Sequence, residues 1–397
     1  MKSKICTVVV VLTALSLIMG CKPAPTPTPK PKATPTPVPP TPTPPPKPIK
    51  IALLAPLSGP VKVYGEGSKN AFMMAVEEWN AKGGILGRKI EPVIGDTKCD
   101  AKEATDVGNK VIFEDKVKFI VGALCSSASI PISEIAESSK VLQISHGSTN
   151  PQVTINPDGS NKEYVFRICY LDPFQGMVDA RFARDDLGAK TAAALYDVGN
   201  DYVKGLAEYF KSAFEELGGK VVVFEAYTEA DTDFSAILTK VAEAEPDILF
   251  LPDYYPKDNL IAAQAKEKGI TATFLGTDGW AGELDMELFE GGYHSNHYSP
   301  ADPRPIVQDF ITTYEEKFGE IPNAPAVLAY DAANVLFSAI EKAGSDDSTA
   351  VKDVLAKSKF ESITGEISFD EHGDPIKKAA INKIEGGKRV FVKFVAP

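Results

Sequence analysis

From residue 49 onward, short continuous apolar runs alternate with longer amphipathic segments. Continuous apolar runs predict strands that are buried on both faces, which is typical of parallel sheets. In the segment 66–82, Ala71, Met74 and Ala75 recur at helical spacing, which predicts a helix. This alternation of strand and helix occurs twice. The expected strands are 49–55, 90–94, 119–122 and 142–145 in the first series, and 191–196, 221–227, 248–251 and 274–276 in the second.

Two series of this kind predict an α/β fold with two doubly wound lobes. The length of 397 residues agrees, because a domain commonly holds ~100–200 residues. In open α/β sheets, ligands bind outside the carboxyl ends of the strands. The other expected helices are 101–114, 130–139, 174–187, 202–217, 234–244, 257–268, 305–318 and 326–343, with late strands near 366–369 and 380–384.

The charge is unevenly distributed along the chain. Overall, 42 basic residues face 54 acidic ones, a net charge of −12. Six of the basic residues precede residue 49 in a stretch without acidic residues. The rest of the chain therefore carries 36 basic residues and 54 acidic ones. A surface this acidic repels phosphate backbones, and we expect no nucleic-acid partner. No internal stretch of eighteen apolar residues occurs, which excludes a polytopic membrane protein.

The N-terminus has the composition of an export signal. Lys2 and Lys4 precede a mostly apolar run too short to span a bilayer, and the run ends in Ile-Met-Gly-Cys. That ending resembles the bacterial lipobox, in which the cysteine is lipidated. We therefore expect a signal peptide over 1–20 and a lipid on Cys21 that anchors the protein to the outer face of the cytoplasmic membrane. A plain signal peptide with an incidental cysteine is the alternative.

The composition of the segment after Cys21 is typical of a tether. Residues 22–48 contain fourteen prolines in 27 positions, with threonine and lysine filling most of the rest. Such a sequence has nothing to bury and favours solvated polyproline II. At ~3.1 Å per residue it could reach ~80 Å from its anchor. We expect residues 21–48 to be a lipidated cysteine and a Pro/Thr-rich tether.

Three cysteines remain beyond the signal and the lipid site: Cys99, Cys125 and Cys169. Outside the cytoplasm, three thiols favour one disulfide and one leftover thiol. The spacing does not choose the pair. Cys169 lies among Phe166, Ile168 and Tyr170, so we expect it to be buried and reduced in a strand.

Three expected strands end in small polar residues. The first end carries Ser58 and Tyr64, the second Ser126 and Ser127, and the third Ser148 and Thr149. Ser126 and Ser127 stand where a helix N-cap belongs, which alone is worth ~1 kcal/mol. Hydroxyls and free amides at a helix N-terminus also bind anions such as carboxylates. Both interpretations fit the residues.

The order of fragments resembles the leucine/isoleucine/valine-binding proteins, the substrate-binding components of branched-chain amino-acid ABC transporters. The similar stretches include A-P-L-S-G-P, E-W-N-A-K-G-G-I-L-G-R-K-I, D-T-K-C-D-A-K-E-A, G-A-L-C-S-S-A-S, I-S-H-G-S-T-N-P, D-Y-Y-P and F-L-G-T-D-G, in the same order between Lys50 and Gly373. The resemblance implies two α/β lobes joined by three crossings that close on a ligand. It assigns 49–170 plus 298–373 to one lobe and 171–297 plus 374–397 to the other.

The resemblance also implies a ligand site for an amino acid. Ser126 would hold the ligand carboxylate, Gly147 would offer a carbonyl to its ammonium, and Thr149, beside Ser148, would contact both groups. From the second lobe, Tyr202 and the acidic Asp278 would complete the head-group site. Tyr64 would line the side-chain pocket. The disulfide would join Cys99 to Cys125, and an ABC permease and its ATPase would be partners of a monomer without cofactor or metal.

Two departures from the family broaden the expected ligand. Asp278 is one methylene shorter than the Glu of the best-known members, and His146 replaces a small residue or Pro. Together with Trp280 and Tyr255, these residues could reshape the side-chain pocket. We therefore expect an amino acid, branched-chain or otherwise apolar, rather than leucine in particular.

Two other function classes compete with this interpretation. An exported enzyme is one, but no G-x-S-x-G elbow occurs, and Gly65-Glu66-Gly67 is only half of a dinucleotide fingerprint. His294 and His297 could begin a metal site, but no H-E-x-x-H or Cys/His cluster completes it, so a loop pair of exposed histidines is expected. A sensor of the same fold for a non-amino-acid carboxylate or amide is the other alternative.

Overall fold

Five parallel strands form the first sheet of the computed structural model, which describes residues 20, 22, 24–28 and 46–397. The expected signal peptide up to residue 19, the expected lipid site Cys21 and most of the expected tether lie outside the described residues. The strand order is β2-β1-β3-β4-β5, with β1, the first apolar run, next to the edge strand β2. The strands are β1 Ile49–Ala55, β2 Ile90–Asp96, β3 Phe119–Gly122, β4 Leu142–Ser145 and β5 Val165–Arg167.

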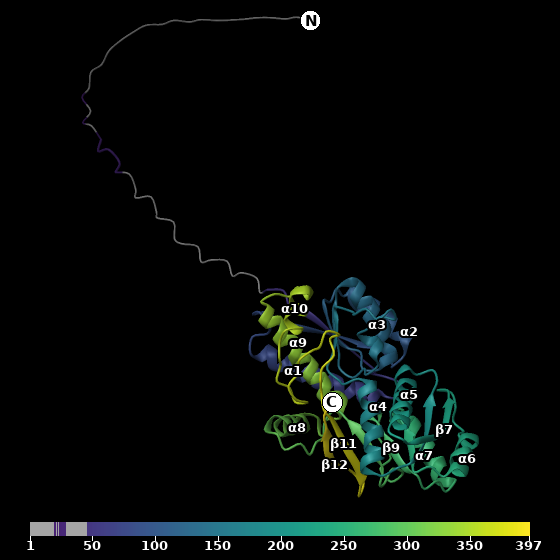
Figure 1. The fold of residues 1–397 in the computed structure, drawn as a ribbon. Coiled ribbons are helices and arrows are strands. Elements are labelled where there is room, and N and C mark those ends of the chain that lie inside the picture. Colours follow the sequence, from purple (N-terminus) through teal and green to yellow (C-terminus); the bar gives the residue numbers. More distant parts are fainter. Residues whose placement is uncertain (1–19, 21, 23, 29–45) are drawn as a thin grey trace, which may run out of the picture. The chain divides into compact units, whose positions relative to one another are not determined.

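Helices cover both faces of this sheet, and we call the whole the first lobe (Figure 1). Alternate residues of β1 point to opposite faces: Ile51 and Leu53 pack with one set of helices, and Ala52 and Leu54 with the other. This is why the apolar runs are continuous. One face carries α1 Lys62–Ala81, α9 Ala324–Ala343 and α10 Ser348–Leu355, and the other carries α2 Ala101–Asn109, its continuation 110–114 and α3 Ser126–Ser139.

The second lobe is built on a seven-stranded sheet of order β12-β11-β10-β9-β8-β6-β7. Helices α4 Asp172–Arg181 and α5 Asp201–Glu216 pack on one face, and α6 Ser235–Ala244 and α7 Tyr255–Glu267 on the other. The strands are β6 Thr191–Asp197, β7 Lys220–Tyr227, β8 Ile248–Leu251, β9 Thr273–Gly276, β10 Tyr293–Asn296, β11 Ala379–Glu385 and β12 Lys388–Val395.

The late part of the chain differs from the expectation. The strands β11 and β12 are antiparallel, and β12 forms the edge of the second sheet (Figure 1). Along β12 exposed and half-buried residues alternate, as in a strand with one wet face. The strand expected near 366–369 forms only single bridges, Phe360 to Ile367 and Phe369 to Pro375. Helix α8, Pro305–Phe318, has the expected bounds.

The chain passes between the two lobes three times: after β5, after β10 and before β11. A buried ion pair fastens the third crossing to the first lobe, because Arg167 Nε donates to Asp374 Oδ1 over 2.5 Å. The same guanidinium donates to the carbonyls of Ser148 and Asn150, at 2.8 and 3.0 Å. The crossing and the loop after β4 are therefore held by one side chain.

Among the residues that the structure describes, no helix is both long enough and apolar enough to cross a membrane.

Candidate functional site

A cavity lies between the two lobes, where β3, β4 and β9 end. Five of the seven ligand residues expected from the sequence line it: Tyr64, Ser126, Gly147, Tyr202 and Asp278. The other lining residues are Leu124, Tyr254, His297, Ala324, Pro325 and Leu328.

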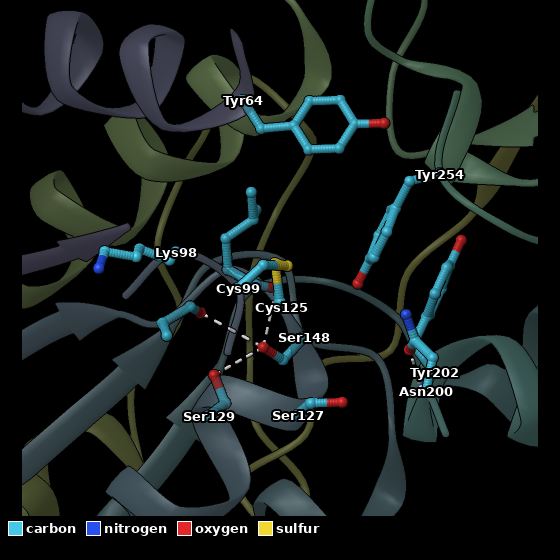
Figure 2. The surroundings of a disulfide bond; sticks show 12 residues. Tyr64, Lys98, Cys99, Cys125, Ser127, Ser129, Ser148, Asn200, Tyr202 and Tyr254 are labelled. Carbon is cyan, nitrogen blue, oxygen red and sulfur yellow. Dashed lines mark hydrogen bonds between the residues drawn. A yellow bond between two sulfur atoms is a disulfide. The ribbon is translucent and has the colours of Figure 1, made fainter. Parts of the chain in front are cut away.

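The two lobes touch across this cavity. The Tyr64 hydroxyl, from α1, donates to the Gly279 carbonyl over 2.5 Å, and the Tyr255 hydroxyl donates to the Pro60 carbonyl over 3.1 Å. Both bonds join the first lobe to the second. Figure 2 shows Tyr64 reaching across from one side, with Tyr202 and Tyr254 on the other. The structure is therefore a closed arrangement of the lobes.

The position of Tyr64 depends on the glycine that follows it. Gly65 lies in α1, and a Cβ atom there would overlap the carbonyl of Pro56. Only glycine lets the helix approach the loop after β1 this closely. The fragment Gly65-Glu66-Gly67 thus serves helix packing beside the cavity.

One end of the cavity suits an anion. Ser126 is the first residue of the 14-residue helix α3, and Cys125 is its N-cap, without a side-chain capping bond. This corrects the expectation that Ser126 and Ser127 occupy the cap position. The first-turn amides of a helix carry partial positive charge, and the Ser126 hydroxyl lies among them. That hydroxyl also accepts a bond from the Asn150 amide, at 3.3 Å.

The loop after β4 contributes in unequal ways. The Ser148 hydroxyl is turned away from the cavity: it donates to the Leu124 carbonyl over 2.8 Å and lies 2.6 Å from Ser129 Oγ (Figure 2). It holds the loop against α3. The Thr149 hydroxyl is buried and has no hydrogen-bond partner among the described residues. The Thr149 side chain lies close to the buried carboxyl of Asp172, and neither Ser148 nor Thr149 is among the residues that line the cavity.

The opposite end of the cavity is anionic. Asp278 opens a short 3-10 helix, Asp278–Trp280, directly after β9, and its side chain is 15% exposed. Its Oδ1 accepts from the Tyr202 hydroxyl at 2.7 Å and from Gln175 Nε2 at 2.9 Å, and its Oδ2 lies 3.2 Å from His297 Nε2. Burial raises the pKa of Asp278, but the hydrogen bond and the charge of His297, together with the hydrogen bonds from Tyr202 and Gln175, outweigh it and lower the pKa below its usual value.

The rest of the wall is apolar and aromatic. The Tyr202 and Tyr254 rings stack 5.2 Å apart at 9°, and the Tyr64 ring meets the Tyr254 ring edge-on at 6.0 Å. Leu124 lies between β3 and α3, and Ala324, Pro325 and Leu328 come from the first turns of α9. A cavity with one end that suits an anion, one anionic end and an apolar wall matches a zwitterion that carries an apolar side chain.

Three residues expected to reshape the pocket lie outside its lining. His146 is fully buried with Nε2 3.1 Å from Ser68 Oγ, and burial lowers its pKa to about 3. Trp280 donates from Nε1 to Asp258 Oδ2 over 2.8 Å. Tyr255 packs edge-on against Tyr64, with ring centres 5.5 Å apart.

The expected loop pair of exposed histidines is wrong. His294 lies in β10 and His297 directly follows it, and both are buried. His294 Nδ1 lies 3.2 Å from the Ser295 carbonyl, while His297 faces Asp278. The polar sequence Tyr-His-Ser-Asn-His hides this strand, because buried parallel strands are usually apolar. Within the described part of the chain, no group of three His, Cys, Asp or Glu residues could hold a metal ion.

A disulfide joins Cys99 to Cys125, with Cα atoms 5.4 Å apart (Figure 2). It ties the loop after β2 to the N-cap of α3. Cys169 is buried and free, as expected, but it lies two residues after β5 rather than in a strand. Burial raises the pKa of the Cys169 thiol to about 12.

The sequence model of the periplasmic binding proteins matches residues 48–388. A leucine-, isoleucine-, valine-, threonine- and alanine-binding protein of Pseudomonas aeruginosa is 36% identical over 332 residues, which cover 82% of this chain and 87% of that protein. The structure of a leucine-binding protein, LivK, from Thermotoga maritima is 35% identical, with a TM-score of 0.83, over 88% of this chain and 99% of that one. LivJ from Streptococcus pneumoniae is a branched-chain amino acid transporter substrate-binding protein, and its structure was solved in complex with isoleucine. It is 31% identical to this chain, with a TM-score of 0.81, and the match covers 88% of this chain and 100% of LivJ.

Proposed function

The chain belongs to the periplasmic binding protein family, and on that premise we propose that it captures an apolar amino acid between its lobes and delivers it to an ABC permease. Two relatives support this proposal: the protein of Pseudomonas aeruginosa binds leucine, isoleucine, valine, threonine and alanine, and LivJ of Streptococcus pneumoniae is a branched-chain amino acid transporter substrate-binding protein in complex with isoleucine. A role in binding rather than catalysis agrees with the family. The observation that carries the proposal is the cavity with Ser126 at one end and Asp278 at the other.

The head group of an amino acid fits these two ends. Its carboxylate would lie at the start of α3, beside the Ser126 hydroxyl and the first-turn amides. Its ammonium would pair with Asp278 and with the Gly147 carbonyl. An apolar side chain would then extend along Leu124 and Leu328.

Closure follows from the division of the site between the lobes. Ser126 and Gly147 belong to the first lobe, and Tyr202 and Asp278 to the second. A ligand that contacts both ends therefore binds the closed form better than the open one. Such differential binding shifts the hinge equilibrium toward closure. The permease and its ATPase would recognise the closed lobes, and one chain suffices for the site, which supports a monomer.

We further propose that the protein is exported and held at the outer face of the cytoplasmic membrane by a lipid on Cys21. The export signal and the Pro/Thr-rich tether support this proposal. A Cys21→Ser variant should move from the membrane fraction to the soluble fraction, with its ligand affinity unchanged. Membrane attachment that persists in this variant would exclude lipidation of Cys21.

A thermal-shift screen tests the ligand class. The protein, refolded free of ligand, is screened against the twenty amino acids and against matched 2-oxo acids, carboxylates and amides. A ligand at one hundred times its Kd stabilises the folded state by about 2.7 kcal/mol, enough for a clear shift. Shifts confined to apolar amino acids would support the proposal. Shifts only with amides or carboxylates that lack an ammonium would replace it with the sensor alternative.

A further inference from the structure

His297 is a cavity residue that the amino-acid site described so far does not use. It lies directly after β10, is 3% exposed and lines the cavity beside Asp278. Its ring packs on the Tyr170 ring, with centres 3.9 Å apart and planes inclined by 33°. Its Nε2 faces Asp278 Oδ2 at 3.2 Å, and its Nδ1 is buried without a hydrogen-bond partner in the described chain. The geometry thus directs one ring nitrogen at the carboxylate.

The acceptor positions on Asp278 are nearly filled. A carboxylate offers about four lone-pair positions. The Tyr202 hydroxyl and Gln175 Nε2 take two on Oδ1, and His297 Nε2 takes one on Oδ2. One position remains for a ligand donor. All three protein donors are neutral when His297 is neutral, so the full negative charge of Asp278 is then left for the ligand.

We propose, building on the proposed function, that His297 is a specificity-determining residue whose protonation decides whether the site takes a ligand with a cationic nitrogen. With a neutral imidazole, Asp278 pairs with the ammonium of an amino acid. With an imidazolium, Asp278 is already paired, and an ammonium would meet a second positive charge in a buried site. The protonated site therefore prefers an apolar carboxylic acid without an ammonium, such as a 2-oxo acid.

The direction of the pH effect follows from closure. Burial lowers the pKa of His297 in the closed form, while the hydrogen bond and charge of Asp278 oppose the lowering. A bound ammonium lowers it further. In an open, wet cleft the imidazole returns toward its ordinary value of about 6.5. Below that pH, binding of an amino acid must expel a proton, so its affinity falls by up to about tenfold per pH unit.

Other titratable groups lie near His297 and Asp278, and their contribution to the pH dependence of binding must be distinguished from that of the imidazole. Asp172 and Asp179 come from α4, and Lys377 comes from the third crossing. Burial raises the pKa of Asp172 to about 8 and lowers that of Lys377 to about 8. All of these groups are unchanged in a His297 variant. The difference between wild type and variant therefore isolates the imidazole. Further titratable groups that interact with Asp278 and are retained in a His297 variant are His294, Tyr64, Tyr170, Tyr202, Tyr254 and Cys169.

The test measures the Kd of leucine and of its 2-oxo analogue by calorimetry between pH 5 and pH 8. Wild type is compared with His297→Gln, which keeps a neutral donor without a titrating ring, and with His297→Phe, which keeps the ring against Tyr170. His372→Gln is the control, because His372 is half-exposed and lies outside the cavity. We expect leucine affinity in wild type and in the control to fall with acidification relative to both His297 variants, while the preference for the 2-oxo acid rises.

Two outcomes are contrary to the inference and differ in meaning. Leucine binding with parallel pH profiles in wild type and in a folded His297 variant would overturn the role of His297 alone. Failure of wild type to bind leucine or any other amino acid at every pH would overturn the proposed function, and the inference with it. Because two variants are measured, the loss of one to misfolding leaves the comparison intact.

Discussion

The hydroxyl of Tyr64 in the first lobe donates to the carbonyl of Gly279 in the second lobe over 2.5 Å. Gly279 directly follows Asp278, the anionic end of the cavity. The bond therefore joins the wall of the cavity in one lobe to the head-group end in the other. Both atoms are buried, so neither has water as an alternative partner in the closed form.

Removal of this hydroxyl should weaken ligand binding by destabilising the closed form. A Tyr64→Phe variant loses one buried hydrogen bond, worth about 1 kcal/mol, so its Kd should rise about fivefold. Tyr314→Phe is the control, because Tyr314 is a buried tyrosine that lies outside the cavity. Titration calorimetry on both variants checks the effect. An unchanged Kd for Tyr64→Phe would mean that the bond does not contribute to closure.

Asp278 should account for most of the affinity for the ammonium group. Asp278→Asn keeps the shape but removes the charge and leaves a buried ligand ammonium unpaired. Breaking such a pair costs about 3 kcal/mol or more, so the Kd for an amino acid should rise at least a hundredfold. Glu283→Gln makes the same chemical change at an exposed position of the same lobe and should bind as wild type does. Retained affinity in Asp278→Asn would refute the ammonium site.

Two serines near the cavity should have separable effects. Ser126→Ala removes a cavity hydroxyl at the start of α3, so it should weaken ligand binding more than it lowers the stability of the fold. Ser148→Ala removes the donor to the Leu124 carbonyl and should cost about 1–3 kcal/mol of unfolding free energy. Thermal unfolding without ligand, measured beside the Kd, distinguishes the two. The reverse pattern would assign Ser148 to the ligand.

The disulfide should stabilise the fold and steady the anion-binding end. Closing its 26-residue loop is worth roughly 3–4 kcal/mol on the chain-entropy model. Reduction should lower the Tm by several degrees, and a Cys99→Ser, Cys125→Ser double variant should match the reduced protein. A Cys169→Ala background removes the free thiol and prevents exchange. Two free thiols at Cys99 and Cys125 in mass spectra of the exported protein would rule the bond out.

The buried strands could be predicted from sequence where they are apolar. The bounds of β1, β3, β4 and β8 agree with the expected runs, because these strands are almost wholly buried and mostly apolar, with Lys50, Gln143 and Ser145 as the polar exceptions. The strands β10 and β12 could not be found this way. β10 is buried but polar, since it carries His294 and is followed by His297. β12 is a half-exposed edge strand whose exposed side chains include Val390, Val392 and Phe394.

The residues of the site also differ in whether the sequence alone could locate them. Ser126 and Gly147 could be located because they follow apolar strands, and the end of a strand is a position in the sequence as well as in space. Asp278 could be located only through the family resemblance. His297 and the first turn of α9 lie at the cavity because of tertiary packing, which their positions in the sequence do not indicate. Ala324 and Pro325 resemble an ordinary helix start, and their contact with the cavity depends on how α9 packs against α1.

The three crossings also determine when folding can finish. The first lobe obtains α9 and α10, and the second obtains β11 and β12, from chain that follows residue 297. A growing or translocating polypeptide that has emerged only to residue 300 therefore contains two unfinished cores. In that chain, α1 lacks its partner helix and β10 lacks its neighbouring strand β11. Premature termination at this point leaves both lobes with exposed apolar surface at once, so the last quarter of the chain decides whether either lobe is stable.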